Sequence, residues 1–152
     1  MQLKHTDLSF YKLANRLAER FQVQTDQHTI VVDIPEDFQV IMADELRIEQ
    51  VMSNLISNAI KYAPGGEIRI TGKTLPECLM ICVSDEGPGI AVGDLPHIFD
   101  RFYRAPENSR KTKGAGLGLY LARAIVEAHG GEMWADPKTE KGARICFSLP
   151  KE

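Results

Sequence analysis

The sequence lacks any long apolar stretch. Its longest unbroken apolar runs are about five residues, as at residues 79–83, whereas a membrane-spanning helix needs roughly 20. We therefore expect no membrane span. The first ten residues, MQLKHTDLSF, contain neither an apolar core nor a small-residue cleavage site, so we also expect no signal peptide.

Neither sign of charge predominates, and cysteine is scarce. Eighteen basic and 21 acidic residues give a net charge of −3, which argues against sequence-independent binding to nucleic acid. The three cysteines, Cys78, Cys82 and Cys146, form no CxxC pair, and their odd number argues against a disulfide framework. Since all three lie in apolar, strand-like stretches, we expect buried thiols in a reducing cytoplasm.

The composition is that of an ordinary globular domain. The chain has 152 residues, of which 43% are hydrophobic and 26% charged, with 12 glycines and eight prolines. These values indicate neither a disordered tail nor a fibrous repeat. A chain of this length buries roughly 70% of its unfolded surface on folding. We therefore expect one domain over residues 1–152, with no internal repeats.

Hydrophobic periodicity predicts the secondary structure. Apolar spacing indicates helices over residues 10–22, 45–62 and 117–129, with Ser9 as N-cap of the first. Strands are predicted at residues 29–34, 39–42, 67–74, 78–85, 132–135 and 143–149. Residues 86–115 show little periodicity, and stretches of this kind are commonly lids or binding loops.

A polar stripe runs along the second predicted helix. At about 100° per residue, Asn54, Asn58 and Lys61 form a stripe beside the apolar face of the helix. Tyr62 lies between this stripe and the apolar face. A solvated face is the ordinary explanation for such a stripe. Alternatively, two amides one turn apart can reach a hydrated Mg²⁺ or two phosphate oxygens, and a lysine one turn further can complement the phosphate charge.

The segment DEGPGI (residues 85–90) follows the most apolar predicted strand. An acidic residue followed by glycines lets one side chain point into a pocket while the backbone passes close to a flat ligand. Ordinary turn formation explains the same residues. In the ligand-binding interpretation, Asp85 accepts a hydrogen bond from an exocyclic amine such as that of adenine.

Two further segments lie before and at the start of the third predicted helix. The glycines of KGAGLGL (residues 113–119) open that helix, where free N–H groups form a ready anion site. The pattern fits neither the dinucleotide fingerprint nor the P-loop, so a phosphate cradle and a flexible helix entry both remain open. The aromatics of IFDRFYR (residues 98–104) are typical of a locally packed cluster, and Arg104 could reach a terminal phosphate.

In this order and spacing, the segments resemble a known family. NLISNAIKYAP, DEGPGI, IFDRFYR and GAGLGL are similar to the N, G1, F and G2 boxes of the catalytic ATP-binding domain of sensor histidine kinases. These belong to the GHKL superfamily, which also contains gyrase-type ATPases and heat-shock chaperones. The resemblance covers the whole chain, since ADELR (residues 43–47) also looks like the lead-in to the N box. Ala115, where the family more often has threonine, is a departure.

The resemblance implies roles for individual residues. Asn54 would ligate Mg²⁺, Asn58 and Lys61 would contact the phosphates of ATP, and Arg104 would reach the γ-phosphate. Asp85 would accept from the adenine amine. The remaining nucleotide contacts would come from Tyr62, Gly87, Gly89, Ile90, Gly114, Gly116, Leu117 and Gly118. Residues 93–115 would form a mobile lid, with Phe99, Phe102 and Tyr103 helping it dock on the phosphoacceptor domain.

The resemblance also implies the fold and the reaction. The fold would be an α/β two-layer sandwich, in which three helices and an ATP lid cover one face of a mixed, mostly antiparallel sheet of about five strands. The domain would transfer the γ-phosphoryl group of ATP to a histidine on a separate dimerisation and phosphoacceptor domain, which passes it to a response regulator.

The four histidines bear on where that acceptor lies. His5, His28, His97 and His129 all lie outside the usual phosphoacceptor context. We therefore expect a catalytic domain without a phosphoacceptor of its own. Since members of the family usually dimerise through the separate helical domain, the resemblance implies that this domain alone is monomeric. The net charge argues against a nucleic-acid partner, and we expect no direct membrane contact. The domain would be cytoplasmic, either by itself or as the cytoplasmic part of a membrane-bound sensor.

Three other activities share these motifs. A superfamily ATPase would need glutamate as general base where this chain has Asn54, whose amide cannot take up a proton at neutral pH. A serine kinase of the anti-sigma-factor type would carry the same boxes. A nucleotide-binding module without enzymatic activity is the third. The full F box and the long lid favour the histidine kinase.

Overall fold

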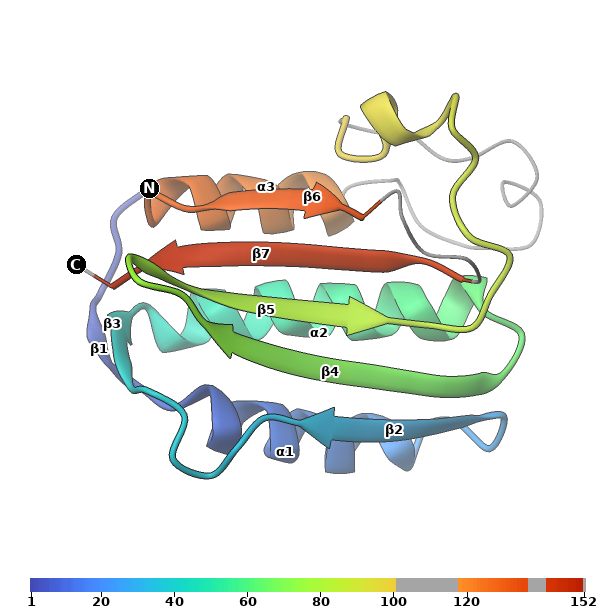
Figure 1. Ribbon diagram of the computed structural model, residues 1–152, viewed down its shortest axis with the longest axis horizontal. Helices are drawn as coiled ribbons and strands as arrows, with labels where there is room; N and C mark the ends of the chain where they lie inside the picture. Colours follow the sequence, from blue (N-terminus) through green and yellow to red (C-terminus); the bar gives the residue numbers. More distant parts are fainter. Residues whose placement is uncertain (101–117, 137–141, 152) are drawn as a thin grey trace.

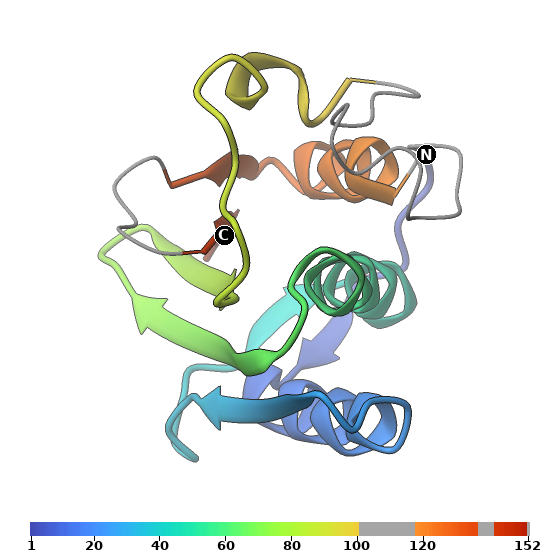
Figure 2. The ribbon, with the colours of Figure 1, turned by 90° about the vertical axis from the view of Figure 1, so that its right-hand side faces the viewer.

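The computed structural model describes residues 1–100, 118–136 and 142–151 (Figure 1). The predicted positions Phe102, Tyr103 and Ala115 lie outside the described residues, as does the predicted lid beyond Asp100. The described chain forms two layers, with helices packed against one face of a sheet (Figure 2).

The larger sheet of the described residues has five strands in the order β2-β4-β5-β7-β6. The strands are β2 (His28–Asp33), β4 (Gly66–Thr74), β5 (Cys78–Ser84), β6 (Glu132–Ala135) and β7 (Arg144–Pro150). β2 runs parallel to β4, and the other pairs are antiparallel. The predicted mixed, mostly antiparallel sheet of about five strands, covered on one face by helices, is confirmed.

Two short strands lie apart from this sheet. β1 (Thr6–Leu8) pairs with β3 (Ile41–Ala43) in antiparallel register, with Leu8 opposite Ile41. The strand predicted at 39–42 therefore joins a different sheet from its neighbours. β1 was not predicted because three residues are too few to show a period. Its Leu8 nevertheless lies fully buried in the core.

Three α-helices are found among the described residues. They are α1 (Phe10–Gln22), α2 (Glu45–Tyr62) and α3 (Gly118–Ala128), and a short 3₁₀ helix, η1 (Leu95–His97), follows the β5 strand. Ser9 Oγ accepts from the Lys12 N–H at 3.2 Å, which confirms the predicted N-cap of α1. Within the described residues, every helix is too short or too polar to cross a lipid bilayer.

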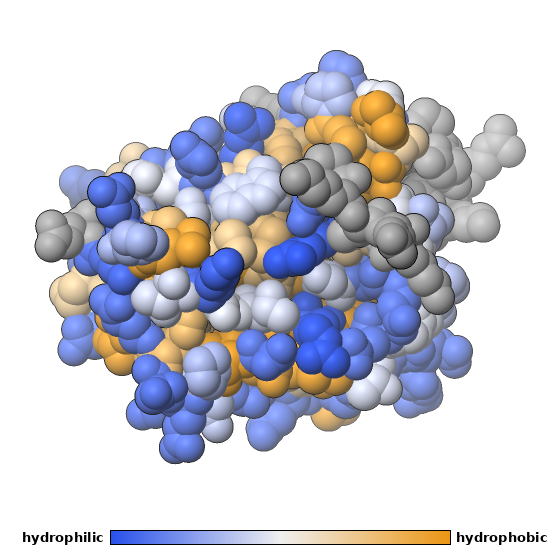
Figure 3. All heavy atoms as spheres, viewed as in Figure 1, coloured by the Kyte–Doolittle hydropathy of each residue, from blue (hydrophilic) through white to orange (hydrophobic). Residues whose placement is uncertain are grey.

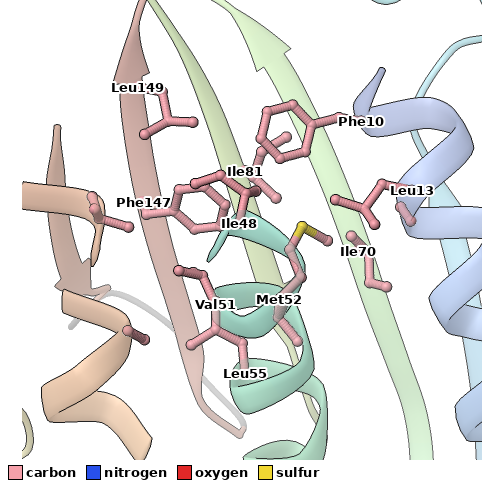
Figure 4. Packing of buried hydrophobic residues seen from close by; sticks show 14 of the residues in the cluster. Phe10, Leu13, Ile48, Val51, Met52, Leu55, Ile70, Ile81, Phe147 and Leu149 are labelled. Atoms are coloured by element: carbon pink, nitrogen blue, oxygen red, sulfur yellow. The ribbon is translucent and has the colours of Figure 1, made fainter. Parts of the chain in front are cut away.

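The core lies between α2 and the inner face of the sheet (Figure 4). The buried residues of α2 are Ile48, Val51, Met52, Leu55, Ile56 and Ala59. They pack against Ile70 of β4, Ile81 of β5 and Phe147 of β7. Burying one such side chain stabilises the fold by roughly 1.5–3 kcal/mol. This packing fixes the rotation of α2 and leaves its polar stripe outside the core.

The cysteines correct one expectation. Cys82 and Cys146, 0% and 2% exposed, are joined by a disulfide between β5 and β7, and Cys78 is free. The register places the two cysteines directly opposite each other, with Cα atoms 4.1 Å apart. Both alternate with core residues and so point to the face away from the helices. The prediction of three buried thiols is wrong for this pair because chain spacing does not reveal strand register.

The face that carries this disulfide is otherwise largely polar. Figure 3 shows hydrophilic side chains on it, interleaved with smaller apolar patches. Arg144 Nη2 lies 3.6 Å from Cys82 Sγ. Its Nη1 lies 3.9 Å from an oxygen of Asp136.

Candidate functional site

The second half of α2 carries the predicted polar stripe. Asn54, Asn58 and Tyr62 are half-buried and Lys61 is exposed. The opposite side of the same helical turns is occupied by Leu55, Ile56 and Ala59 in the core. Hydrophobic packing on that side therefore holds the stripe in a fixed direction.

Asn54 ties α2 to the beginning of α3. Its Nδ2 donates to the backbone carbonyl of Gly118 at 3.1 Å. Because a carbonyl can only accept, this bond assigns the amide nitrogen to the α3 side and directs Oδ1 elsewhere. Among the described residues, none donates to that oxygen. Asn54 thus offers an oriented oxygen ligand beside the start of α3.

Asp85 lies immediately after β5 and is held from two directions. Its Oδ1 accepts from the N–H groups of Gly87 at 2.9 Å and Ala143 at 3.1 Å. Its own N–H donates to the Ala143 carbonyl at 2.9 Å. None of the described residues donates to Oδ2. The carboxylate is therefore fixed through one oxygen, and the other is available to a ligand.

Burial governs the ionisation of Asp85. Desolvation raises the pKa of its carboxyl above the usual 3.8, partly offset by the two backbone hydrogen bonds and by electrostatic attraction from His28. A carboxylate at the end of a strand with a perturbed pKa is typical of binding and catalytic sites.

Glycines allow the backbones around Asp85 to approach closely. A Cβ on Gly87 would lie 2.9 Å from the Ala63 Cα atom, so the loop touches the end of α2. Gly142 has φ +80°, and a Cβ there would overlap the carbonyl oxygen of Asp85. A Cβ on Gly89, with φ +83°, would lie 3.0 Å from the Gly142 carbonyl oxygen. The loop after β5 is thus wedged between α2 and the segment that enters β7.

The described part of the predicted site gathers along α2. Asn54 contacts the start of α3, and Ala63, nine residues further along α2, contacts the loop after Asp85. Asn58, Lys61 and Tyr62 lie between these two contacts. The half-buried Ile90 lies in the same loop as Gly87. The predicted site positions Arg104, Gly114, Gly116 and Leu117 lie outside the described residues.

Phe99, from the segment IFDRFYR, packs within the domain. It is only 9% exposed, and the Arg123 guanidinium lies 5.5 Å from its ring centre. This is a favourable cation–π arrangement. Phe99 therefore packs locally, in line with the interpretation of this segment as a packed cluster, and its part in docking stays a prediction.

Sequence reasoning missed two contributors to the site. Ala143 supplies an N–H to Asp85 from 58 residues away. His28 reaches the carbonyl of Ala63 from 35 residues away. Neither residue belongs to one of the four motifs, and the sequence holds no signal that predicts their contacts with Asp85 and Ala63.

A hollow of about 280 Å³ lies elsewhere, beside the two chain ends, and is lined by His5, Met42, His129, Leu149, Pro150 and Lys151. His129 Nδ1 lies 2.8 Å from the Ile125 carbonyl, and its Nε2 accepts from the Asp44 N–H at 3.1 Å. Both ring nitrogens are therefore occupied. The hollow is separate from the Asp85 site.

Residues 43–152 match the family described as histidine kinase-, DNA gyrase B- and HSP90-like ATPases. The chain therefore belongs to this ATPase family. It is 39% identical over 148 residues to the sensor histidine kinase WalK of Bacillus subtilis (strain 168), covering 94% of this chain and 24% of WalK. It is 41% identical over 124 residues to the adaptive-response sensory kinase SasA of Synechococcus sp. (strain CC9311), covering 80% of this chain and 32% of SasA.

Solved structures agree with the family. The nucleotide-free catalytic domain of histidine kinase ThkA superposes with a TM-score of 0.86 at 29% identity, covering 98% of this chain and 97% of that one. Full-length ShkA in complex with AMPPNP gives a TM-score of 0.87 at 26% identity, covering 99% of this chain and 32% of ShkA. The chain thus has the fold of a histidine kinase catalytic domain, and it spans about a quarter to a third of the curated relatives named above.

Proposed function

We propose that this chain binds Mg²⁺–ATP and transfers its γ-phosphoryl group to a histidine on a separate phosphoacceptor domain. The observation that carries the proposal is the Asp85 carboxylate, fixed through Oδ1 and open at Oδ2, at one end of the polar stripe of α2. The opposite end of that stripe, Asn54, adjoins the start of α3. The site thus offers an acceptor for a base and polar groups for phosphates at opposite ends.

The base is recognised by Asp85. Its ionised Oδ2 accepts from the exocyclic amine of adenine, a group that only donates hydrogen bonds. Gly87 and Gly89 keep the contacts with the ring that the family resemblance implies, and Ile90 and Tyr62 flank it. A half-buried carboxylate disfavours a base that carries a carbonyl at the same position, because two acceptors would face each other.

The phosphates lie along α2 toward α3. Asn58 and Lys61 contact phosphate oxygens, and the N–H groups at the start of α3, including Gly118, face negative charge. Arg104, Gly114, Gly116 and Leu117 keep the roles that the family resemblance implies for them. Arg104 would neutralise charge on the γ-phosphoryl group during transfer.

Asn54 fits a magnesium ion. Its Oδ1 is a neutral oxygen donor whose direction is fixed by the Nδ2 bond to Gly118. Mg²⁺ prefers oxygen ligands, and in phosphoryl-transfer sites it usually keeps several waters and substrate phosphates. When bound, the ion neutralises charge on the phosphates. A single protein ligand, Asn54 Oδ1, is therefore reasonable for this ion.

The acceptor lies on another domain. The ring nitrogens of His28 and His129 are engaged in contacts within the chain, and His97 Nδ1 lies 3.0 Å from Asp100. The ring of His5 packs against that of His129, with centroids 5.6 Å apart. We propose that the phosphoacceptor domain belongs to the same kinase and that a response regulator receives the phosphoryl group. We also propose that the domain is a monomer when isolated and that it lies in the cytoplasm of the cell.

Calorimetry tests the binding step. The chain is titrated with ATP in the presence of Mg²⁺, then with EDTA replacing Mg²⁺. We expect micromolar-range affinity, typical of modest nucleotide sites, and weaker binding without the metal. Absence of binding heat at millimolar ATP with Mg²⁺ would overturn the proposal.

Phosphoryl transfer is tested with γ-labelled ATP and a purified histidine phosphoacceptor domain of a sensor kinase. The expected product is an acid-labile, alkali-stable phosphohistidine. An acid-stable phosphoserine would instead support the serine kinase alternative. Hydrolysis is expected to be slow, because Asn54 cannot act as a general base for water.

A further inference from the structure

His28 is the most buried titratable side chain near the proposed base site that the proposed function does not use. It begins β2 and is 7% exposed. Its Nδ1 lies 2.6 Å from Thr25 Oγ1, and its Nε2 lies 2.8 Å from the carbonyl oxygen of Ala63. A buried imidazole with both nitrogens engaged holds two segments together, here the α1–β2 connection and the end of α2.

The bond to Ala63 holds the point where α2 ends. Ala63 is the C-cap, with an extended backbone (φ −91°, ψ 128°), and its carbonyl therefore points out of the helical hydrogen-bond ladder. A carbonyl only accepts, so His28 Nε2 carries the hydrogen. The Thr25 hydroxyl can rotate, so it donates to Nδ1 when Nε2 carries the hydrogen.

Ala63 in turn forms the wall against which the Asp85 loop packs. A Cβ on Gly87 would lie 2.9 Å from the Ala63 Cα atom, so neither backbone can move toward the other. The Gly87 N–H donates to Asp85 Oδ1 at 2.9 Å. A displacement of Ala63 therefore changes the position of the group that orients the carboxylate.

An electrostatic relation agrees with this geometry. Attraction from His28 is one of the effects that lower the pKa of Asp85 against the larger effect of burial.

We propose that His28 is a positioning residue of the base pocket, which holds the end of α2 against the loop after β5 and so aims Asp85 Oδ2 at the adenine amine. The proposal rests on the proposed function, since it assumes that Asp85 reads the base. His28 itself touches Ala63 and Thr25, and it acts on the nucleotide through Asp85.

Two amide substitutions test the role of His28. In His28→Gln, the amide nitrogen lies as many bonds from Cα as Nε2 does in histidine, so it can still donate to Ala63. In His28→Asn, the side chain is one carbon shorter and cannot reach. Thr25→Val is a control that removes the other partner of the ring and keeps the Ala63 bond.

The readout is the ratio of ATP to ITP affinity, measured by calorimetry with Mg²⁺. ITP has a carbonyl where ATP has the amine, so the ratio reports how well Asp85 is aimed. We expect His28→Asn to lose roughly tenfold of this discrimination, about the value of one misplaced hydrogen bond. His28→Gln and Thr25→Val should retain most of it. A wild-type ratio in His28→Asn, or equal losses for both nucleotides, would overturn the role of His28.

A measurement without nucleotide separates this proposal from the proposed function. The NMR shifts of the Gly87 and Ala143 amide protons report their bonds to Asp85 Oδ1. We expect the Gly87 proton to move upfield in His28→Asn and to stay near its wild-type position in His28→Gln. Unchanged shifts in His28→Asn would refute the positioning role, whereas a wild-type protein that fails to bind ATP would refute the proposed function instead. Should His28→Asn fail to fold, His28→Met, which fills a similar space without a donor for the Ala63 carbonyl, takes its place in both measurements. An upfield Gly87 shift and a reduced ATP/ITP ratio in His28→Met would support the proposal, and wild-type values would overturn it.

Discussion

At the scale of single residues, the two carboxylate oxygens of Asp85 have different roles. Oδ1 accepts from the N–H groups of Gly87 and Ala143 and so fixes the plane of the carboxylate. Oδ2 has no donor among the described residues and is the atom that we assign to the base. Because the fixing bonds come from backbone groups, a substitution at position 85 changes the chemistry of the free atom while keeping its position.

We expect Asp85→Asn to exchange an acceptor for a donor. The asparagine Oδ1 can keep both backbone bonds, which places Nδ2 where Oδ2 was. Two donors then face each other when ATP binds, and the affinity should fall roughly tenfold to a hundredfold. ITP should lose little. Calorimetry with both nucleotides measures this, with thermal unfolding as the control for folding, and undiminished ATP affinity would exclude Asp85 from reading the base.

The raised pKa of Asp85 sets the pH dependence of binding. Since burial raises the pKa of the carboxyl above 3.8, the group takes up its proton at a higher pH in the folded protein than in the unfolded chain. The amine of adenine needs the ionised form, so ATP affinity should decline as pH falls through this raised value. The stability contribution has the opposite direction: it is complete below 3.8 and is lost as pH rises through the folded pKa.

Affinity measured from neutral pH down to about pH 4 tests this dependence. The matched control is Asp85→Asn with the same nucleotide, because ATP itself titrates in this range and its contribution is common to both proteins. The difference between the two affinity profiles should follow the titration of a single group. Parallel profiles would mean that Asp85 does not titrate on binding.

At the scale of elements, α2 depends on Asp44 at its N-terminus. Asp44 Oδ1 accepts from the Arg47 N–H at 3.2 Å, and Oδ2 accepts from the Lys4 N–H at 2.9 Å. The backbone hydrogen bond from Lys4 is the main cause that lowers the pKa of Asp44 below its usual value. Its own N–H donates to His129 Nε2 at 3.1 Å, so one residue connects α2 to the segment before β1 and to the end of α3.

We expect Asp44→Ala to lower the free energy of unfolding by about 1 kcal/mol or more, because it removes an N-cap and the Lys4 bond. Asp44→Asn should cost less, since its amide oxygen still caps α2. Urea denaturation of both variants measures the difference. Equal destabilisation by the two substitutions would mean that charge, rather than capping, is the main contribution.

Close backbone packing at Gly142 gives a second element-scale prediction. Gly142→Ala would place a methyl group on the Asp85 carbonyl oxygen at a positive φ, so it should disturb the Asp85 loop and weaken ATP binding at least tenfold. Gly93→Ala is the control, because a Cβ there meets nothing within 4 Å. ATP titrations of both variants give the answer, and normal binding by Gly142→Ala would contradict the tight contact.

At the scale of the whole molecule, the disulfide joins two strands whose cysteines are 64 residues apart in the sequence. Alkylation in denaturant without reductant should label Cys78 alone. Labelling of all three cysteines would show that Cys82 and Cys146 are free thiols, as the sequence predicted. Cys82→Ser should lower the free energy of unfolding by about 2–4 kcal/mol, because the cross-link restricts the unfolded chain. Cys78→Ser, which removes no bond, is the matched control in the same urea denaturation.

Local features were predictable over much of the molecule. The helices at 10–22 and 45–62 follow from apolar spacing, with Ser9 as the predicted N-cap of the first, and both begin and end where predicted. The strands over 67–74 and 78–85 match β4 and β5 to within a residue. β1 escaped prediction because it is stabilised by pairing with β3, which no local pattern shows.

The sequence by itself determined the polar stripe of α2, the acidic end of β5 and the family, because side-chain spacing within one element and the order of motifs are local properties. The tertiary structure alone decided the rest: Ala143 orienting Asp85, His28 holding Ala63, and Cys82 meeting Cys146. Each of these contacts depends on which strands are neighbours and in what register they pair. Register follows from how the whole core packs, so residues far apart in the chain meet only when every layer is in place.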